Sequence, residues 1–145
     1  MDPETRTPAQ PPPAAPAAHA PHLFTLRSAR VVTAPKICRD FVVGVVRAIG
    51  WGDLADSAAV CTSELVTNTY LHAGGAHLLL RVRVAPRRVR VTVIDGSAVR
   101  FGEGRAADDA VSGRGLLLVS ALADRCGAAD RWGVWFELDT PVKAA

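Results

Sequence analysis

The sequence predicts an α+β protein in which a mixed, mostly antiparallel sheet carries helices on one face, so that sheet and helices form a two-layer sandwich. Apolar residues recur at three- to four-residue spacing in two segments before residue 75, which is typical of helices packed on one side. They alternate with arginines in two segments around Pro86, which is typical of an antiparallel hairpin. Two further strand-like segments close the chain, after a short apolar helix.

The sequence predicts a strand followed by a helix in the first part of the chain after the proline-rich segment. Residues 23–32 are rich in branched and aromatic apolar side chains, which predicts an irregular strand at an edge of the sheet. Thr33 fits the N-cap of a helix with Pro35 in its first turn, and Gly50 fits its end. The apolar stripe predicted for this helix consists of Ile37, Phe41, Val45 and Ile49.

A second helix is predicted to start near Asp53 and to stop at the glycine pair 74–75. Its predicted inner face consists of Leu54, Ala58, Cys61 and Leu65.

The hairpin comes next. Residues 78–84 and 89–93 alternate apolar with polar side chains around a turn at Pro86, which predicts a hairpin with one basic outer face. Residues 96–113 are rich in Gly, Asp and Ala without a sustained period, which predicts a mobile loop. The remaining predicted elements are a short helix over 116–123 and strands over 124–127 and 133–139.

Size and composition indicate one domain. The chain has 145 residues, of which 49% are apolar, enough for one compact core. Seven of the ten prolines lie within residues 1–21, and a segment of this kind buries too little surface to offset its ordering entropy. We expect a disordered Pro/Ala-rich tail over 1–21, a domain over 22–141 and a short C-terminal tail over 142–145.

Charge and cysteine usage predict a cytoplasmic protein. The formal charge of +3 comes from arginines spread along the chain, a pattern more typical of a solvated sheet face than of a nucleic-acid site. The sequence shows neither the pattern of a signal peptide nor an apolar stretch long enough for a membrane span. The widely spaced Cys38, Cys61 and Cys126 predict buried free thiols in a reducing compartment. From the charge pattern and the short apolar stretches we expect no direct nucleic-acid or membrane partner.

One pair of polar residues on the second helix is a candidate for chemistry. Glu64 and Asn68 are four residues apart, so both side chains leave the same face of the helix. The Asn oxygen can serve as a Mg2+ ligand beside phosphate oxygens and waters, and the carboxylate can accept a proton from a hydroxyl. The pair alone does not establish a functional site, because Glu and Asn are common on helix surfaces. His72, one turn further, fits either a phosphate contact or a partner of the helix dipole.

A second candidate lies at the end of a predicted strand. Asp95 is followed by Gly96 and Ser97, where the backbone must turn. A carboxylate in this position can accept a hydrogen bond from an exocyclic amine, although Asp is also a frequent turn residue.

A third candidate is a glycine-flanked helix start. Gly113, Arg114 and Gly115 precede the short helix that opens at Leu116. Backbone N–H groups at such a start can face a phosphate, and the same glycines also fit simple capping. The Arg114 side chain fits either a bidentate phosphate contact or a solvated position.

These motifs occur in an order that resembles the GHKL ATPases, in their branch of anti-sigma-factor serine/threonine kinases. The segment SELVTNTYLHA (63–73) resembles the N box, VIDGS (93–97) the G1 box and SGRGLLLVSALADRCG (112–127) the G2 box. The closing WGVWFELD (132–139) is similar to the last strand of that branch. The resemblance covers about residues 23–140, and it implies the Bergerat ATP-binding fold, with a histidine kinase-like ATPase domain over 22–141.

By position, the resemblance implies that Glu64 is the general base, Asn68 the Mg2+ ligand and Asp95 the reader of the adenine amino group. It implies phosphate contacts at 113–115 and a short ATP lid over 101–112. ATP and Mg2+ are the implied cofactors. The candidate cofactor-binding residues are Asn68, His72, Asp95, Gly96, Ser97, Gly113, Arg114, Gly115 and Leu116, with Asn68 as the metal ligand and Glu64 as the catalytic residue.

The resemblance also implies partners. The branch phosphorylates a serine or threonine hydroxyl of a STAS-type antagonist and sequesters a sigma factor, and its members pair as homodimers. One departure concerns the G1 box, usually Asp-x-Gly, because Gly96 directly follows Asp95 here and Ser97 takes the later position. This change would narrow the adenine pocket. Two functions therefore stay open: a kinase, or a non-catalytic module that binds its partners with ATP or without any nucleotide.

Overall fold

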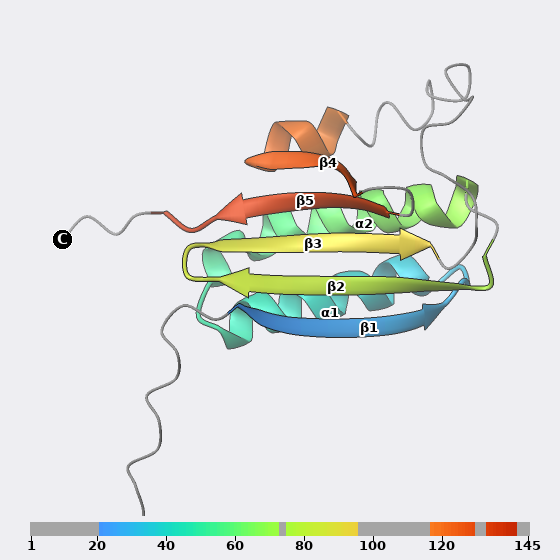
Figure 1. The fold of residues 1–145 in the computed structure, drawn as a ribbon, viewed down its shortest axis with the longest axis horizontal. Coiled ribbons are helices and arrows are strands. Elements are labelled where there is room, and N and C mark those ends of the chain that lie inside the picture. The colour runs from blue at the N-terminus through green and yellow to red at the C-terminus, as the bar shows by residue number, and fades with distance from the viewer. Residues whose placement is uncertain (1–20, 73–74, 96–116, 130–132, 142–145) are drawn as a thin grey trace, which may run out of the picture.

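The structure is a computed structural model that describes residues 21–72, 75–95, 117–129 and 133–141 (Figure 1). A further helical segment covers residues 117–122. Residues 1–20 of the predicted N-terminal tail, the predicted C-terminal tail and the predicted loop over 96–113 lie outside the described residues. The elements are β1 (His22–Ala29), α1 (Ala34–Ala48), the 3-10 turn η1 (Gly52–Leu54), α2 (Ala55–His72), β2 (His77–Ala85), β3 (Arg88–Asp95), β4 (Arg125–Ala129) and β5 (Gly133–Asp139).

The strands form one sheet in the order β1-β2-β3-β5-β4. All four pairings of the described strands are antiparallel, and β1 lies at an edge as predicted. Figure 1 shows α1 and α2 side by side on one face of the sheet. The predicted α+β sandwich is therefore confirmed. None of the helices in the described part of the chain is long and apolar enough to cross a membrane.

The start of α1 follows the predicted pattern, although β1 is shorter than expected. Val31 and Val32 lie in the turn after β1 and are exposed. Thr33 is the N-cap residue of α1, and Pro35 lies in its first turn. Gly50 follows the helix with a φ of 86°. Glycine adopts this left-handed conformation at little cost, which explains why the helix ends here.

The buried stripe of α1 differs from the predicted one. The fully buried residues of this helix are Ala34, Cys38, Val42 and Val46. Phe41, Val45 and Ile49 pack beside them and are only partly buried, whereas Ile37 is 47% exposed. The prediction was wrong because two apolar series with the same four-residue spacing run next to each other on this helix. The series that begins with small side chains is the one that faces the core.

The core lies between the sheet and the two helices. The predicted inner residues of α2 at positions 58, 61 and 65 are buried, and Leu54 packs beside them. The hairpin buries its predicted apolar series toward the helices, namely Leu78, Leu80, Val82, Val84, Val89, Val91 and Val93. Its arginines lie on the opposite face, where Arg83 of β2 is the register partner of Arg90 of β3.

The cysteine prediction is confirmed for two residues and wrong for the third. Cys38 and Cys61 are buried, and burial raises the pKa of each thiol to about 11. Cys126 is exposed. It lies in the edge strand β4, where its neighbours Arg125, Gly127 and Ala128 are exposed too, so the apolar residues before it in the sequence do not bury it. All three are free thiols.

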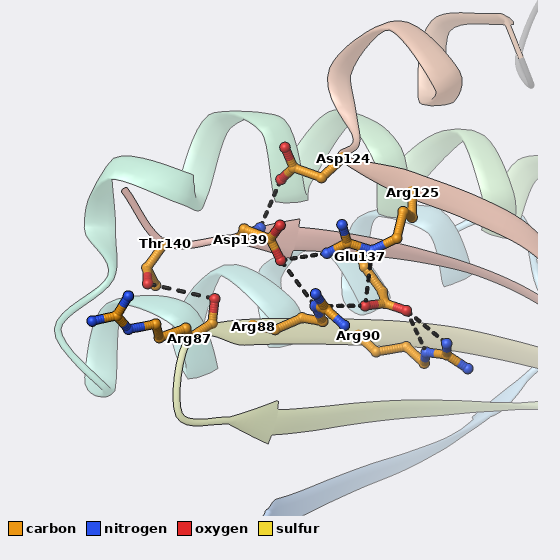
Figure 2. A network of polar contacts seen from close by, with 8 residues as sticks. All are labelled: Arg87, Arg88, Arg90, Asp124, Arg125, Glu137, Asp139 and Thr140. Carbon is orange, nitrogen blue, oxygen red and sulfur yellow. Dashed lines mark hydrogen bonds and ion pairs between the residues drawn. The ribbon is translucent and has the colours of Figure 1, made fainter. Parts of the chain in front are cut away.

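A carboxylate is buried on the outer face of the sheet (Figure 2). The Glu137 side chain is only 4% exposed. Arg88 Nε lies 2.9 Å from Glu137 Oε2, and Arg90 Nη2 lies 2.6 Å from Oε1. Arg125 Nε lies 3.5 Å from Oε2. Burial raises the pKa of Glu137, but the hydrogen bond from Arg90 and the charges of the three arginines outweigh it, so the pKa lies below its ordinary value.

We expect Glu137→Gln to lower the free energy of unfolding by about 1–3 kcal/mol at neutral pH, because three arginines lose a shared buried charge. Since the pKa of Glu137 is lower in the folded state, its contribution is complete above the unfolded pKa and is lost as pH falls through the folded value. Urea unfolding from about pH 7 to about pH 3 should therefore show a shallower acid dependence in the variant. The variant should keep part of the acid dependence of stability, because Arg125 and Arg88 lower the pKa of Asp139 too.

The matched control for this prediction is Asp40→Asn. Asp40 pairs with Lys36 at 2.5 Å, but both side chains are exposed on α1. Exposed pairs of this kind contribute little to stability, so the control should unfold close to wild type. Equal acid dependence in Glu137→Gln and wild type would show that the ionised Glu137 does not stabilise the fold.

Candidate functional site

Asp95 is the last residue of β3 and is 2% exposed. It continues the inward-facing series of this strand after Val89, Val91 and Val93, so its side chain belongs to the layer between sheet and helices. A carboxylate in such a layer needs polar partners, because burial of an uncompensated charge is costly. A carboxylate at this position can accept hydrogen bonds from donor groups at the end of β3.

Glu64 and Asn68 lie on α2, one turn apart, and both side chains are half-buried. The buried residues Leu65 and Val66 anchor the same part of α2 in the core. The two polar side chains therefore border the core while remaining accessible to a ligand. His72 is the last residue of α2, and its side chain lies outside the described part of the structure.

The topology brings Asp95 and the C-terminal half of α2 to the same end of the sandwich. Asp95 pairs with Leu78, which is the second residue of β2. The helix α2 ends at His72, shortly before β2 begins. In Figure 1 the end of α2, the start of β2 and the tip of β3 lie together at the right. Asp95 and the helix end that follows Asn68 thus come from elements that meet at one end of the sandwich, while Glu64 lies near the middle of α2.

The other predicted site residues cannot be placed, because they lie outside the described residues: Gly96, Ser97, Gly113, Arg114, Gly115 and Leu116. The predicted lid over 101–112 lies outside them as well. The short helix expected after Gly113, Arg114 and Gly115 is present over 117–122. Its Val119 is fully buried and joins the core, so this helix is anchored in the domain.

The donor set at this end fits Mg2+ held partly by a nucleotide. The described residues contain no group of three or more His, Cys, Asp and Glu side chains arranged for a metal ion. Mg2+ bound with a nucleotide does not need such a cage, because phosphates and waters supply most of its oxygen ligands. One Asn oxygen, that of Asn68, is then a sufficient protein contribution.

Sequence reasoning missed one residue that contacts the end of α2. Arg30 lies in the turn after β1, and its guanidinium group donates hydrogen bonds to the carbonyl oxygen of Tyr70. The two residues are 40 positions apart in the chain. No local motif marks such a contact, so no signal in the sequence pointed to it.

Comparison with known proteins agrees with this arrangement. A search of the curated proteins finds no match to the chain. The family model of the histidine kinase-like ATPase domain matches residues 28–134, which is well over half of the chain. The match includes Glu64, Asn68 and Asp95. The chain therefore belongs to the histidine kinase-like ATPase domain family, and this membership implies that it binds ATP.

Proposed function

We propose that this protein is an ATP- and Mg2+-dependent serine/threonine protein kinase of the anti-sigma-factor type. Its proposed substrate is a hydroxyl group of a STAS-type antagonist, and its second proposed partner is a sigma factor that it sequesters in the cytoplasm. A homodimer is part of the proposal. The observation that carries it is that β3 ends at the buried Asp95 on the side of the sandwich where α2, the helix of Glu64 and Asn68, also ends.

Each of these residues has a role in the proposed reaction. Asp95 accepts a hydrogen bond from the exocyclic amine of adenine, in a layer from which water is largely excluded. Asn68 is the residue that would hold Mg2+, which neutralises phosphate charge when bound. Glu64 takes the proton of the attacking hydroxyl while the hydroxyl oxygen bonds to the γ-phosphorus. The bond from this phosphorus to the bridging oxygen breaks, and ADP leaves.

The test of this proposal is ATP binding measured by calorimetry with and without Mg2+. We expect wild type to bind ATP more tightly with Mg2+ than without it. In Asn68→Ala this gain in affinity should be at least about tenfold smaller, which is equivalent to about 1.4 kcal/mol of binding free energy. Asp56→Ala is the matched control, because Asp56 is an exposed residue in the first turn of the same helix. No binding by wild type would leave a nucleotide-free interaction domain as the better account.

A second function is favoured by one observation in the sequence. Gly96 directly follows Asp95, and this spacing departs from the usual G1 box. A narrower adenine pocket would suit a non-catalytic module that binds a sigma factor or an antagonist without transferring phosphate. The two functions differ in whether control of the partner requires Glu64.

A further inference from the structure

The C-terminal end of α2 is held by a side chain from another part of the chain. The last carbonyl groups of a helix have no partner within it. Arg30 supplies one for Tyr70, because its Nε donates to the Tyr70 carbonyl oxygen at 3.1 Å and its Nη2 donates to the same atom. A positive charge at this end also interacts favourably with the helix dipole.

The same arginine also contacts the segment that leads from α2 into β2. Its Nη1 lies 3.5 Å from the carbonyl oxygen of Gly75. Its backbone N–H donates to the carbonyl oxygen of Ala76 at 2.9 Å. The guanidinium carbon lies 5.8 Å from the centroid of the Tyr70 ring, within the range of a cation–π contact. Arg30 thus joins the end of α2, the approach to β2 and the end of β1.

The Tyr70 ring that Arg30 contacts leaves α2 on a different side from Asn68. Tyr70 follows Asn68 by two residues, which places it roughly 200° further around the helix axis. Arg30 therefore does not compete with a ligand of Asn68. It can influence that residue only through the position of the last turns of α2.

We propose that Arg30 is a positioning residue for the nucleotide site. It fixes the C-terminal turns of α2 against the sheet, and with them the distance between Asn68 and Asp95. This inference rests on the proposed function, because the site in question is the proposed ATP and Mg2+ site. Glu64 lies one turn deeper in the helix than Asn68, so loss of the contact should affect Asn68 more strongly. The planar fork of Arg is required, because the ammonium group of Lys cannot reproduce these contacts.

The test compares Arg30→Ala and Arg30→Lys with wild type, using the full chain. Hydrogen exchange of the nucleotide-free protein reports on the last turn of α2, and calorimetry reports on ATP binding with and without Mg2+. In Arg30→Ala we expect amides of this turn to exchange at least about tenfold faster, because helix ends without bonded carbonyls open more readily. We expect the Mg2+-dependent gain in ATP affinity to fall at least about fivefold, while binding without Mg2+ stays near wild type.

Arg27→Ala is the matched control. Arg27 is an exposed arginine of β1 with no hydrogen bond or ion pair to any residue that the structure describes. We expect wild-type exchange and binding in this variant. In Arg30→Lys the charge is kept and the fork is lost, so the Mg2+-dependent gain should lie between those of wild type and Arg30→Ala. If Arg30→Ala does not fold, a gain in Arg30→Lys below wild type still supports the inference, and an unchanged gain overturns it.

The outcomes separate the inference from the proposed function. Faster exchange in Arg30→Ala with an unchanged Mg2+-dependent gain would make Arg30 a structural cap only and would overturn its positioning role. Unchanged exchange would overturn it as well. Absence of ATP binding by wild type overturns the proposed function, and the positioning role of Arg30 falls with it.

Discussion

Replacement of Glu64 by Gln is expected to slow phosphoryl transfer by about 10²–10⁴-fold at saturating ATP, with little change in ATP affinity. Gln has nearly the same shape as Glu but cannot accept the proton of the attacking hydroxyl. Glu64 is half-buried on α2, one turn before Asn68, so the substitution keeps the packing of the helix. Single-turnover measurements with ATP and a STAS-type protein separate the transfer step from nucleotide binding.

Asp56→Asn is the control for this prediction, because it removes a carboxylate from the exposed first turn of the same helix. Its transfer rate should equal that of wild type. A wild-type rate in Glu64→Gln would mean that another group takes the proton. Undiminished control of the partner proteins by a Glu64→Gln variant that transfers no phosphate would favour the non-catalytic module.

The hairpin was predictable because its sequence has a single period. Apolar and polar residues alternate along β2 and β3, so only one face of the pair can be buried, and the structure buries that face. The helix α1 was less predictable, because apolar residues occupy neighbouring positions around it. The structure buries the series of Cys38 rather than that of Ile37. Which series is buried depends on how closely the helix approaches the core, and the spacing of apolar residues does not contain that information.

The candidate site was predictable where its residues are neighbours in the sequence. The four-residue spacing of Glu64 and Asn68 predicted a shared helix face, and α2 spans both positions. The burial of Asp95 depends on the layer above it and had to come from the structure.

Contacts between distant segments left no signal in the sequence. Arg30 meets Tyr70 over 40 positions. Glu137 meets Arg88, Arg90 and Arg125, which come from two other strands of the sheet. Arginines and carboxylates are common in every segment, so their pairing follows from strand order and register rather than from local pattern.

The Asp95→Asn variant is expected to bind ATP about ten- to a hundredfold more weakly, because a hydrogen bond to a charged acceptor contributes about 1.5–3 kcal/mol. Its amide can donate as well as accept, so it no longer rejects a base that has a carbonyl oxygen in place of the amine. The preference for ATP over GTP should therefore shrink. Calorimetric titration of both nucleotides measures this preference directly.

Asp139→Asn is the control for Asp95→Asn, since it changes a carboxylate on the outer face of the same sheet. It should leave the preference for ATP unchanged. Thermal unfolding of Asp95→Asn checks that the loss of a buried charge has not altered the fold. A folded Asp95→Asn variant with wild-type affinity and preference would show that Asp95 does not read the base. Adenine recognition would then have to come from outside β3.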